Sequence, residues 1–253
     1  MTEPKRTIRL LLEGFPDPPA LDTAVSRVIL QRVSDGRDPE TLRIHRASPV
    51  VAFGPLDRIA PGFADAVAAA RDRGFSPVFR LAGGRAAVFH EQTLAFSWVV
   101  PDPTPRLRTR KRFQEASEIV AHALRALRVD ARVGAVAGEY CPGEYSLNAR
   151  DRTKLVGVGQ RVVARAAHVG GVVVVGGSRR IREVLVPVNE ALGIDWDPAT
   201  VGSLQDEVSS ITREDTVRAI VAAFADRYEP VRGTIDEATL QLARRLEPEH
   251  RAA

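Results

Sequence analysis

The residues best suited to covalent chemistry lie in one segment of the chain, residues 139–175. Cys141 is the only cysteine in the sequence and is followed directly by Pro142 and Gly143. The proline fixes the backbone just after the sulfur, at a turn rather than inside an apolar run. A free cysteine is often only a small apolar side chain, and that role is the alternative here. A cysteine on a rigid turn near a lysine is nevertheless a candidate thiolate nucleophile.

Lys154 is the second candidate in this segment, and it is one of three lysines in a chain whose other basic residues are arginines. Residues 150–153 before it predict a hairpin turn, so a solvated turn lysine is one interpretation. The other is a lysine that points into a pocket, where its compact charge holds an acyl carbonyl or a carboxylate. Gly157 and Gly159 follow in a predicted strand, and missing side chains there suit close packing against a long thin ligand.

A second segment, residues 80–98, is the predicted partner of the first. Its glycine pair at 83–84 allows close backbone approach or positive φ, although such pairs are often simple turns. Arg80 and Arg85 flank the pair and are candidates for holding a carboxylate or phosphate. His90 closes the segment as either a structural hydrogen-bonding group or a base. His168 precedes a valine run that predicts a core strand, beside glycines that can open a channel wall.

Composition narrows the classes of function. The chain has 253 residues, 44% hydrophobic and 27% charged, which is ordinary for a globular protein. One cysteine excludes an internal disulfide and a cysteine-based zinc site, and we expect no metal. No apolar run is long enough to cross a bilayer and the first residues do not resemble a signal peptide, so we expect a cytoplasmic protein with no membrane partner.

The positive charge of the chain does not predict nucleic-acid binding. The net charge is +4 and the pI about 9.7, but the charges are scattered. The densest basic cluster, residues 106–112, follows prolines and lacks interleaved aromatic residues. We interpret it as a solvated loop, with a docking patch for an acidic protein partner as the alternative.

The periodicity of apolar residues predicts alternating strands and helices. The expected strands cover residues 7–12, 41–45, 50–53, 77–81, 86–89, 94–100, 131–136, 145–148, 155–163 and 168–175. The expected helices cover residues 21–33, 63–73, 112–127, 178–192, 214–228 and 235–246, with Pro187 breaking or kinking the fourth. The predicted fold class is α+β: a single domain over residues 1–253, with a central mixed, largely antiparallel sheet flanked by helices and a short helical extension from about residue 212.

Three motifs in order resemble the biotin/lipoate protein ligase superfamily. These are GGRAAVFH at 83–90, YCPGEYSL at 140–147 and KLVGVGQR at 154–161. The lipoate-protein ligase A family is the nearest group, and within it the cysteine-containing segment is similar to that of the cysteine-dependent octanoyl transferases. The loop at 195–204 resembles the same branch, and the similarity spans residues 10–224.

This resemblance implies a mixed sheet with an acyl tunnel, an acyl thioester on Cys141 and a Lys154 that contacts the acyl carbonyl. It implies transfer of octanoyl or lipoyl groups to lipoyl domains of 2-oxoacid dehydrogenase subunits and of the glycine cleavage H protein, without a cofactor. The substrate-binding residues predicted in this way are Arg80, Gly83, Gly84, Arg85, His90, Gly157, Gly159 and His168.

Two alternatives stay open at this point. An ATP-dependent lipoate-protein ligase would use ATP and Mg, with Lys154 binding a lipoyl-adenylate and Cys141 incidental. A non-catalytic module would bind acyl groups or lipoyl domains without turnover. Such ligases usually have a third glycine where this chain has Arg85 and commonly lack a cysteine at position 141, and both departures favour the transferase.

Overall fold

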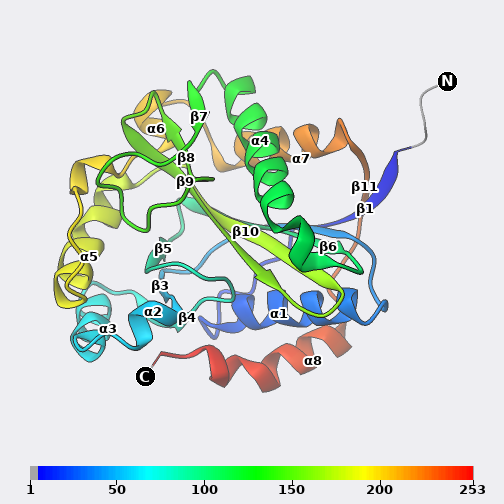
Figure 1. Cartoon of the computed structure of the whole chain (residues 1–253), viewed down its shortest axis with the longest axis horizontal. Coiled ribbons are helices and arrows are strands. Elements are labelled where there is room, and N and C mark those ends of the chain that lie inside the picture. The colour runs from blue at the N-terminus through cyan, green and yellow to red at the C-terminus, as the bar shows by residue number, and fades with distance from the viewer. Residues whose placement is uncertain (1–4, 253) are drawn as a thin grey trace.

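The computed structural model describes residues 5–252, and an eight-stranded mixed sheet forms its centre. The strand order is β11-β1-β2-β6-β10-β9-β8-β7 (Figure 1). The strands are β1 (Arg6–Leu11), β2 (Thr41–Arg46), β6 (Thr93–Pro101), β7 (Ala131–Val133), β8 (Leu147–Ala149), β9 (Thr153–Val162), β10 (Ala166–Val174) and β11 (Tyr228–Arg232). Among the described residues of this sheet, only the β11-β1 and β1-β2 pairings are parallel, so the predicted mixed and largely antiparallel sheet is confirmed.

A smaller sheet with the order β4-β3-β5 lies beside the large one. Its strands are β3 (Val50–Phe53), β4 (Ser76–Phe79) and β5 (Ala87–Phe89). Helix α3 (Phe63–Asp72) packs against α5 (Ser178–Ala191), and the short α2 (Pro55–Arg58) follows β3 (Figure 1). The chain between β4 and β5 carries the glycine pair, so the small sheet positions one half of the candidate site.

Two layers of helix cover the large sheet. Helices α4 (Thr109–Ala126) and α7 (Arg213–Ala225) pack on one face over a core that includes Trp98 and Phe224. Helices α1 (Leu21–Ser34) and α8 (Glu237–Leu246) pack together on the other face (Figure 1). Helix α6 (Leu204–Glu207) and the 3-10 turns at Pro105–Arg108, Pro198–Thr200 and Glu247–His250 complete the chain. None of the helices in residues 5–252 is long and apolar enough to cross a bilayer.

Glycines let strands β9 and β10 approach closely at their centre. Gly170 pairs with Gly159, and the neighbouring Val172 pairs with Gly157. A Cβ added at Gly171 would lie 1.8 Å from the Gly157 carbonyl oxygen, so no larger residue fits there without movement. The strand glycines singled out in the sequence therefore contribute to the close packing within the sheet itself.

One expectation about the C-terminal half was wrong. The predicted helix over residues 214–228 ends at Ala225, and Tyr228 begins strand β11, which pairs with β1. The extension after residue 212 is therefore not purely helical. Pro187 lies inside α5 without ending it, and the expected alternative of a kink stays a prediction. The Glu183 carbonyl, one turn earlier, accepts a hydrogen bond from Arg73 Nη1 at 2.9 Å, which replaces the bond that proline cannot make.

Candidate active site

Cys141 lies in the loop between β7 and β8, in direct contact with the glycine-pair loop that follows β4. Its backbone φ of 46° is in the left-handed region, and its side chain is partly exposed. The Sγ atom accepts a hydrogen bond from the Arg85 backbone N–H at 3.1 Å and lies 3.9 Å from Arg80 Nη1. The two segments singled out in the sequence thus meet at the sulfur, and both donors stabilise negative charge on it.

The glycine pair has a steric role at this contact. Gly84 has a φ of 115°, and a Cβ there would lie 3.0 Å from Cys141 Sγ and 2.9 Å from Arg80 Nη1. Its carbonyl oxygen would in turn lie 1.7 Å from a Cβ at Gly54. Gly83 has open space around it and an ordinary φ. Close approach of the loop to the sulfur therefore depends on Gly84, not on Gly83.

The two arginines of this loop point to different partners. Arg85 Nη1 lies 3.4 Å from Asp57 Oδ1, and burial raises the pKa of the Asp57 carboxyl. Arg80 Nη1 donates to the Arg85 carbonyl oxygen at 2.9 Å. A Cβ at Gly159 would lie 2.9 Å from Arg80 Nη2, so this glycine leaves room for the guanidinium to pass the β9 strand.

Lys154 is 1% exposed and its ammonium is fully engaged by the protein. Nζ donates to Glu139 Oε1 at 2.8 Å, to the Tyr140 carbonyl at 3.0 Å and to the Cys141 carbonyl at 2.7 Å. Three donors with three acceptors leave none free in this state. Lys154 therefore braces the loop that carries Cys141, while its contact with an acyl carbonyl stays a prediction.

Glu139 is the group that the sequence analysis missed at this position. It is 3% exposed, and its carboxylate also accepts from the Val136 N–H at 2.9 Å, the Ser146 hydroxyl at 2.9 Å and the Gly143 N–H at 3.3 Å. These bonds fold the Cys141 loop around one buried carboxylate. Lys154 itself was the sequence signal for this carboxylate, because a buried ammonium group requires a nearby carboxylate.

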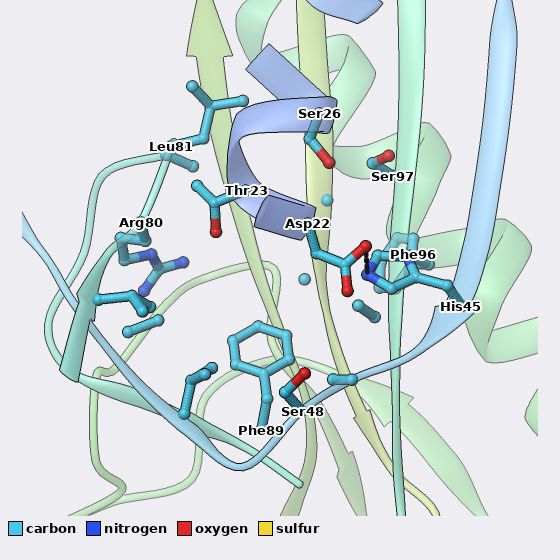
Figure 2. Close-up of a pocket in the computed structure, with 18 of the residues that line it drawn as sticks. Asp22, Thr23, Ser26, His45, Ser48, Arg80, Leu81, Phe89, Phe96 and Ser97 are labelled. Carbon is cyan, nitrogen blue, oxygen red and sulfur yellow. Dashed lines mark ion pairs between the residues drawn. The ribbon is translucent and has the colours of Figure 1, made fainter. Parts of the chain in front are cut away.

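A cavity of about 110 Å³ opens between the large sheet, the small sheet and the start of α1. Engineered apolar cavities of about 150 Å³ hold benzene, so the space suits a slender ligand. Figure 2 shows Arg80 on one side of this cavity and, on the other, Asp22 and His45, whose Oδ1 and Nε2 atoms lie 3.5 Å apart. Because Arg80 also lies beside Cys141 Sγ, the arginine marks the end of the cavity nearest the sulfur.

The two predicted histidines have different positions. His168 lines the cavity, and burial, with smaller effects of Arg43 and Arg80, lowers its pKa to about 4. His90 is buried away from the cavity lining, where Nδ1 accepts the Gln92 N–H at 3.2 Å. A Cβ at Gly177 would lie 2.6 Å from the His90 ring, which places it at the start of α5. The sequence analysis missed His45 and Asp22, which reach the cavity from β2 and α1.

Comparisons with known proteins identify the family of this chain. Residues 18–225 match the model of the lipoyl protein ligase A/B catalytic domain. The chain belongs to this family. It is 26% identical over 224 residues to an octanoyl-[GcvH]:protein N-octanoyltransferase of Anoxybacillus flavithermus, covering 82% of this chain and 79% of the relative. The Geobacillus kaustophilus protein of the same name is 24% identical over 203 residues, or 80% of this chain and 68% of the relative.

Solved structures show the same fold. A lipoate protein ligase structure from T. acidophilum superposes with a TM-score of 0.75 at 21% identity, over 96% of this chain and 95% of the other. A lipoate-protein ligase A bound with ATP gives 0.74 at 20% identity, over 96% and 95%. These structures confirm the predicted fold class, and the match of residues 18–225 to the family model confirms the predicted family.

Proposed function

We propose that the protein transfers an octanoyl or lipoyl group to the acceptor lysine of lipoyl domains through a thioester on Cys141. The observation that carries this proposal is the position of Cys141 Sγ between the Arg85 backbone N–H and the guanidinium of Arg80, an arginine that also lines the cavity. Curated relatives are named octanoyl- and lipoyl-[GcvH]:protein transferases, which supports the same reaction class.

The proposed reaction has two displacement steps. The Cys141 thiolate attacks the acyl carbonyl of the donor, a C–S bond forms, and the donor amine or thiol leaves with a proton. The ε-amine of the acceptor lysine then attacks the thioester, so that a C–N bond forms and the C–S bond breaks. The thiolate is regenerated and the amine proton is released. The net change is movement of one acyl group between two proteins.

In each proposed step, negative charge develops on the oxygen of the acyl carbonyl next to Cys141, between the Cys141 loop and the glycine-pair loop. The Arg85 backbone N–H and the Arg80 guanidinium are the donors nearest the sulfur, and both are placed before reaction begins. Lys154 Nζ lies 2.7 Å from the carbonyl oxygen of Cys141 itself. In the proposed reaction it keeps the acylated residue in place and turns one donor toward the acyl carbonyl.

Partners and cofactors belong to the same proposal. Relatives named for the glycine cleavage H protein support that protein as donor. A structural neighbour with 20% identity is titled as a lipoate protein ligase and its E2 lipoyl domain. We propose lipoyl domains of 2-oxoacid dehydrogenase subunits as acceptors in the cytoplasm. We propose no ATP or metal in the reaction, because transfer from an acylated lysine of one protein to a lysine of another exchanges one amide for another and needs no net activation.

Intact mass measurement of an apo lipoyl domain tests the proposal. One mixture contains the protein with octanoylated H protein and no ATP, and the other contains free octanoate or lipoate with ATP and magnesium. Modification in the first mixture alone is the expected result. Modification in the second alone would establish an ATP-dependent ligase, and binding of the lipoyl domain without modification in either would establish a non-catalytic module.

A further inference from the structure

The densest basic cluster of the chain lies on the surface at the start of α4. Its exposed members, called the basic patch from here on, are Arg106, Leu107, Arg108, Arg110 and Lys111. Arg112, the last residue of the cluster, is not part of the patch, because it is buried and pairs with Asp102 at 2.7 Å. The basic patch therefore consists of positive side chains around one apolar side chain, Leu107, which is 85% exposed.

Little of the charge of the basic patch is neutralised by the protein itself. Arg110 pairs with Glu144 at 3.1 Å, but both side chains are largely exposed, at 83% and 67%. Within residues 5–252, no carboxylate lies at ion-pair distance from Arg106, Arg108 or Lys111. An exposed concentration of like charge attracts partners of the opposite sign and raises the rate at which they associate.

The stability of α4 does not explain this charge. The positive end of the helix dipole lies at the first turn, where acidic side chains stabilise a helix and basic side chains destabilise it. The first turn of α4 contains no acidic residue, and the N-cap residue Arg108 makes no side-chain hydrogen bond to the helix. Arg110 and Lys111 add charge of the unfavourable sign. Departures from local rules of this kind are expected where function requires them.

The basic patch is joined to the loop that carries Cys141. Arg110 Nε donates to the Tyr145 hydroxyl at 3.1 Å, and the Tyr145 ring stacks on Phe113 with ring centroids 5.1 Å apart. The Ser117 hydroxyl donates to the Tyr145 carbonyl oxygen at 2.8 Å. Tyr145 and Cys141 belong to the same loop, between β7 and β8. A macromolecule that docks on the basic patch therefore lies beside this loop.

A second set of contacts fixes the start of α4 to strand β9. Arg112 Nε donates to Gln160 Oε1 at 2.9 Å, and Gln160 Nε2 donates to the Thr109 carbonyl oxygen at 3.0 Å. The neighbouring Gly159 is the residue that leaves room for the Arg80 guanidinium. The basic patch is thus held rigidly against the two segments of the chain that surround the sulfur.

We propose that the basic patch docks an acidic surface of the protein domains that deliver and accept the acyl group. The proposal rests on the proposed acyl transfer and names the surface that its protein partners use. Both displacement steps take place at one sulfur, so the donor and the acceptor must each bring a lysine to the same loop. One patch beside that loop serves both partners in turn, with Leu107 as an apolar contact inside a charged rim.

Reversal of charge tests the proposal. The double variant Arg106→Glu, Arg108→Glu is compared with Arg37→Glu, Arg232→Glu, which makes the same change in net charge. Arg37 and Arg232 are exposed, and Arg232 lies on β11, at the opposite edge of the sheet from β7 and β8. The kcat/KM of transfer from octanoylated H protein to an apo lipoyl domain at low salt should fall at least about tenfold in the first variant. The control should stay near the wild type.

Two further readouts separate docking from damage to the site. Cys141 of the Arg106→Glu, Arg108→Glu variant should be acylated by octanoyl-N-acetylcysteamine at the wild-type rate, because this small thioester needs no docking surface. The Tm of the variant should equal or exceed that of the wild type, because glutamate replaces arginine at the start of α4. Wild-type transfer between proteins in this variant, or an equal loss of acylation by the small thioester, would overturn the proposal. Unchanged transfer with loss of binding to duplex DNA would assign the basic patch to nucleic acid instead.

Failure of the acyl transfer itself is recognised separately. If neither the small thioester nor octanoylated H protein acylates Cys141 of the wild type, the proposed function is wrong, and calorimetry with the apo lipoyl domain then tests docking alone. Binding at least about tenfold weaker in Arg106→Glu, Arg108→Glu than in the wild type would uphold the docking surface. Equal binding by the two, or no binding to the wild type, would overturn it.

Discussion

Replacing Lys154 by methionine should destabilise the protein far more than replacing another lysine. The ammonium and the Glu139 carboxylate are 1% and 0% exposed and 2.8 Å apart. The two loop carbonyls of Tyr140 and Cys141 take its remaining donors. Removing one partner of a buried ion pair costs about 3–5 kcal/mol, because the other charge is left uncompensated. For a chain of this size that corresponds to a fall in Tm of about 6–20 °C.

Denaturant unfolding of Lys154→Met provides the assay. Lys111→Met is the matched control, because Lys111 is an exposed lysine on α4. Hydrogen exchange should quicken at the Val136 and Gly143 amides, since both donate to Glu139. The double variant Lys154→Met, Glu139→Gln should recover part of the loss, with a coupling energy of at least about 1 kcal/mol. Equal stability of Lys154→Met and Lys111→Met would refute the idea that this lysine braces the Cys141 loop.

Two further predictions concern the glycine-pair loop and the cavity. Gly84→Ala should slow acylation of Cys141 at least about tenfold, because the added Cβ meets Cys141 Sγ and the backbone φ of Gly84 is positive. The control Gly83→Ala should acylate at the wild-type rate, because the space around Gly83 is open. Equal acylation rates in the two variants would contradict the steric role of Gly84. The lowered pKa of His168, about 4 against about 6.5 unfolded, means that stability is full above pH 6.5 and falls toward pH 4, by up to about 3 kcal/mol. His168→Gln should flatten this fall in denaturant unfolding and exposed His122→Gln should not, so matching pH profiles of wild type and His168→Gln would disprove the assignment.

Most of the fold was predictable because its elements have clear apolar periods. Strand β11 could not be predicted, because the segment Tyr228–Arg232 contains a proline and two charged residues, and its first residue continues the apolar period of the preceding helix. Its position is set by long-range contacts: Tyr228 packs edge-on against Trp98, with ring centroids 6.0 Å apart. Edge strands of this kind depend on tertiary packing more than on local propensity.

The candidate site was predictable where chemistry concentrates in one segment. Cys141, Lys154 and the glycine-pair loop were identified by residue type and spacing, and the structure brings them together. The part of the cavity lined by Asp22 and His45 could not be predicted, because the two residues belong to different elements, α1 and β2, whose side chains meet only in the folded protein. His90 belongs to the same motif but lies outside the cavity lining, and its role in substrate binding stays a prediction.

The covalent role of Cys141 is the central claim, and transfer by Cys141→Ala tests it most directly. Wild-type protein, octanoylated H protein and an apo lipoyl domain are incubated without ATP, and amide formation and the enzyme mass are followed together. We predict a hydroxylamine-sensitive octanoyl adduct on Cys141 of the wild type, and a loss of transfer of at least about a thousandfold in Cys141→Ala. Transfer by Cys141→Ala at a rate near that of the wild type would contradict the account.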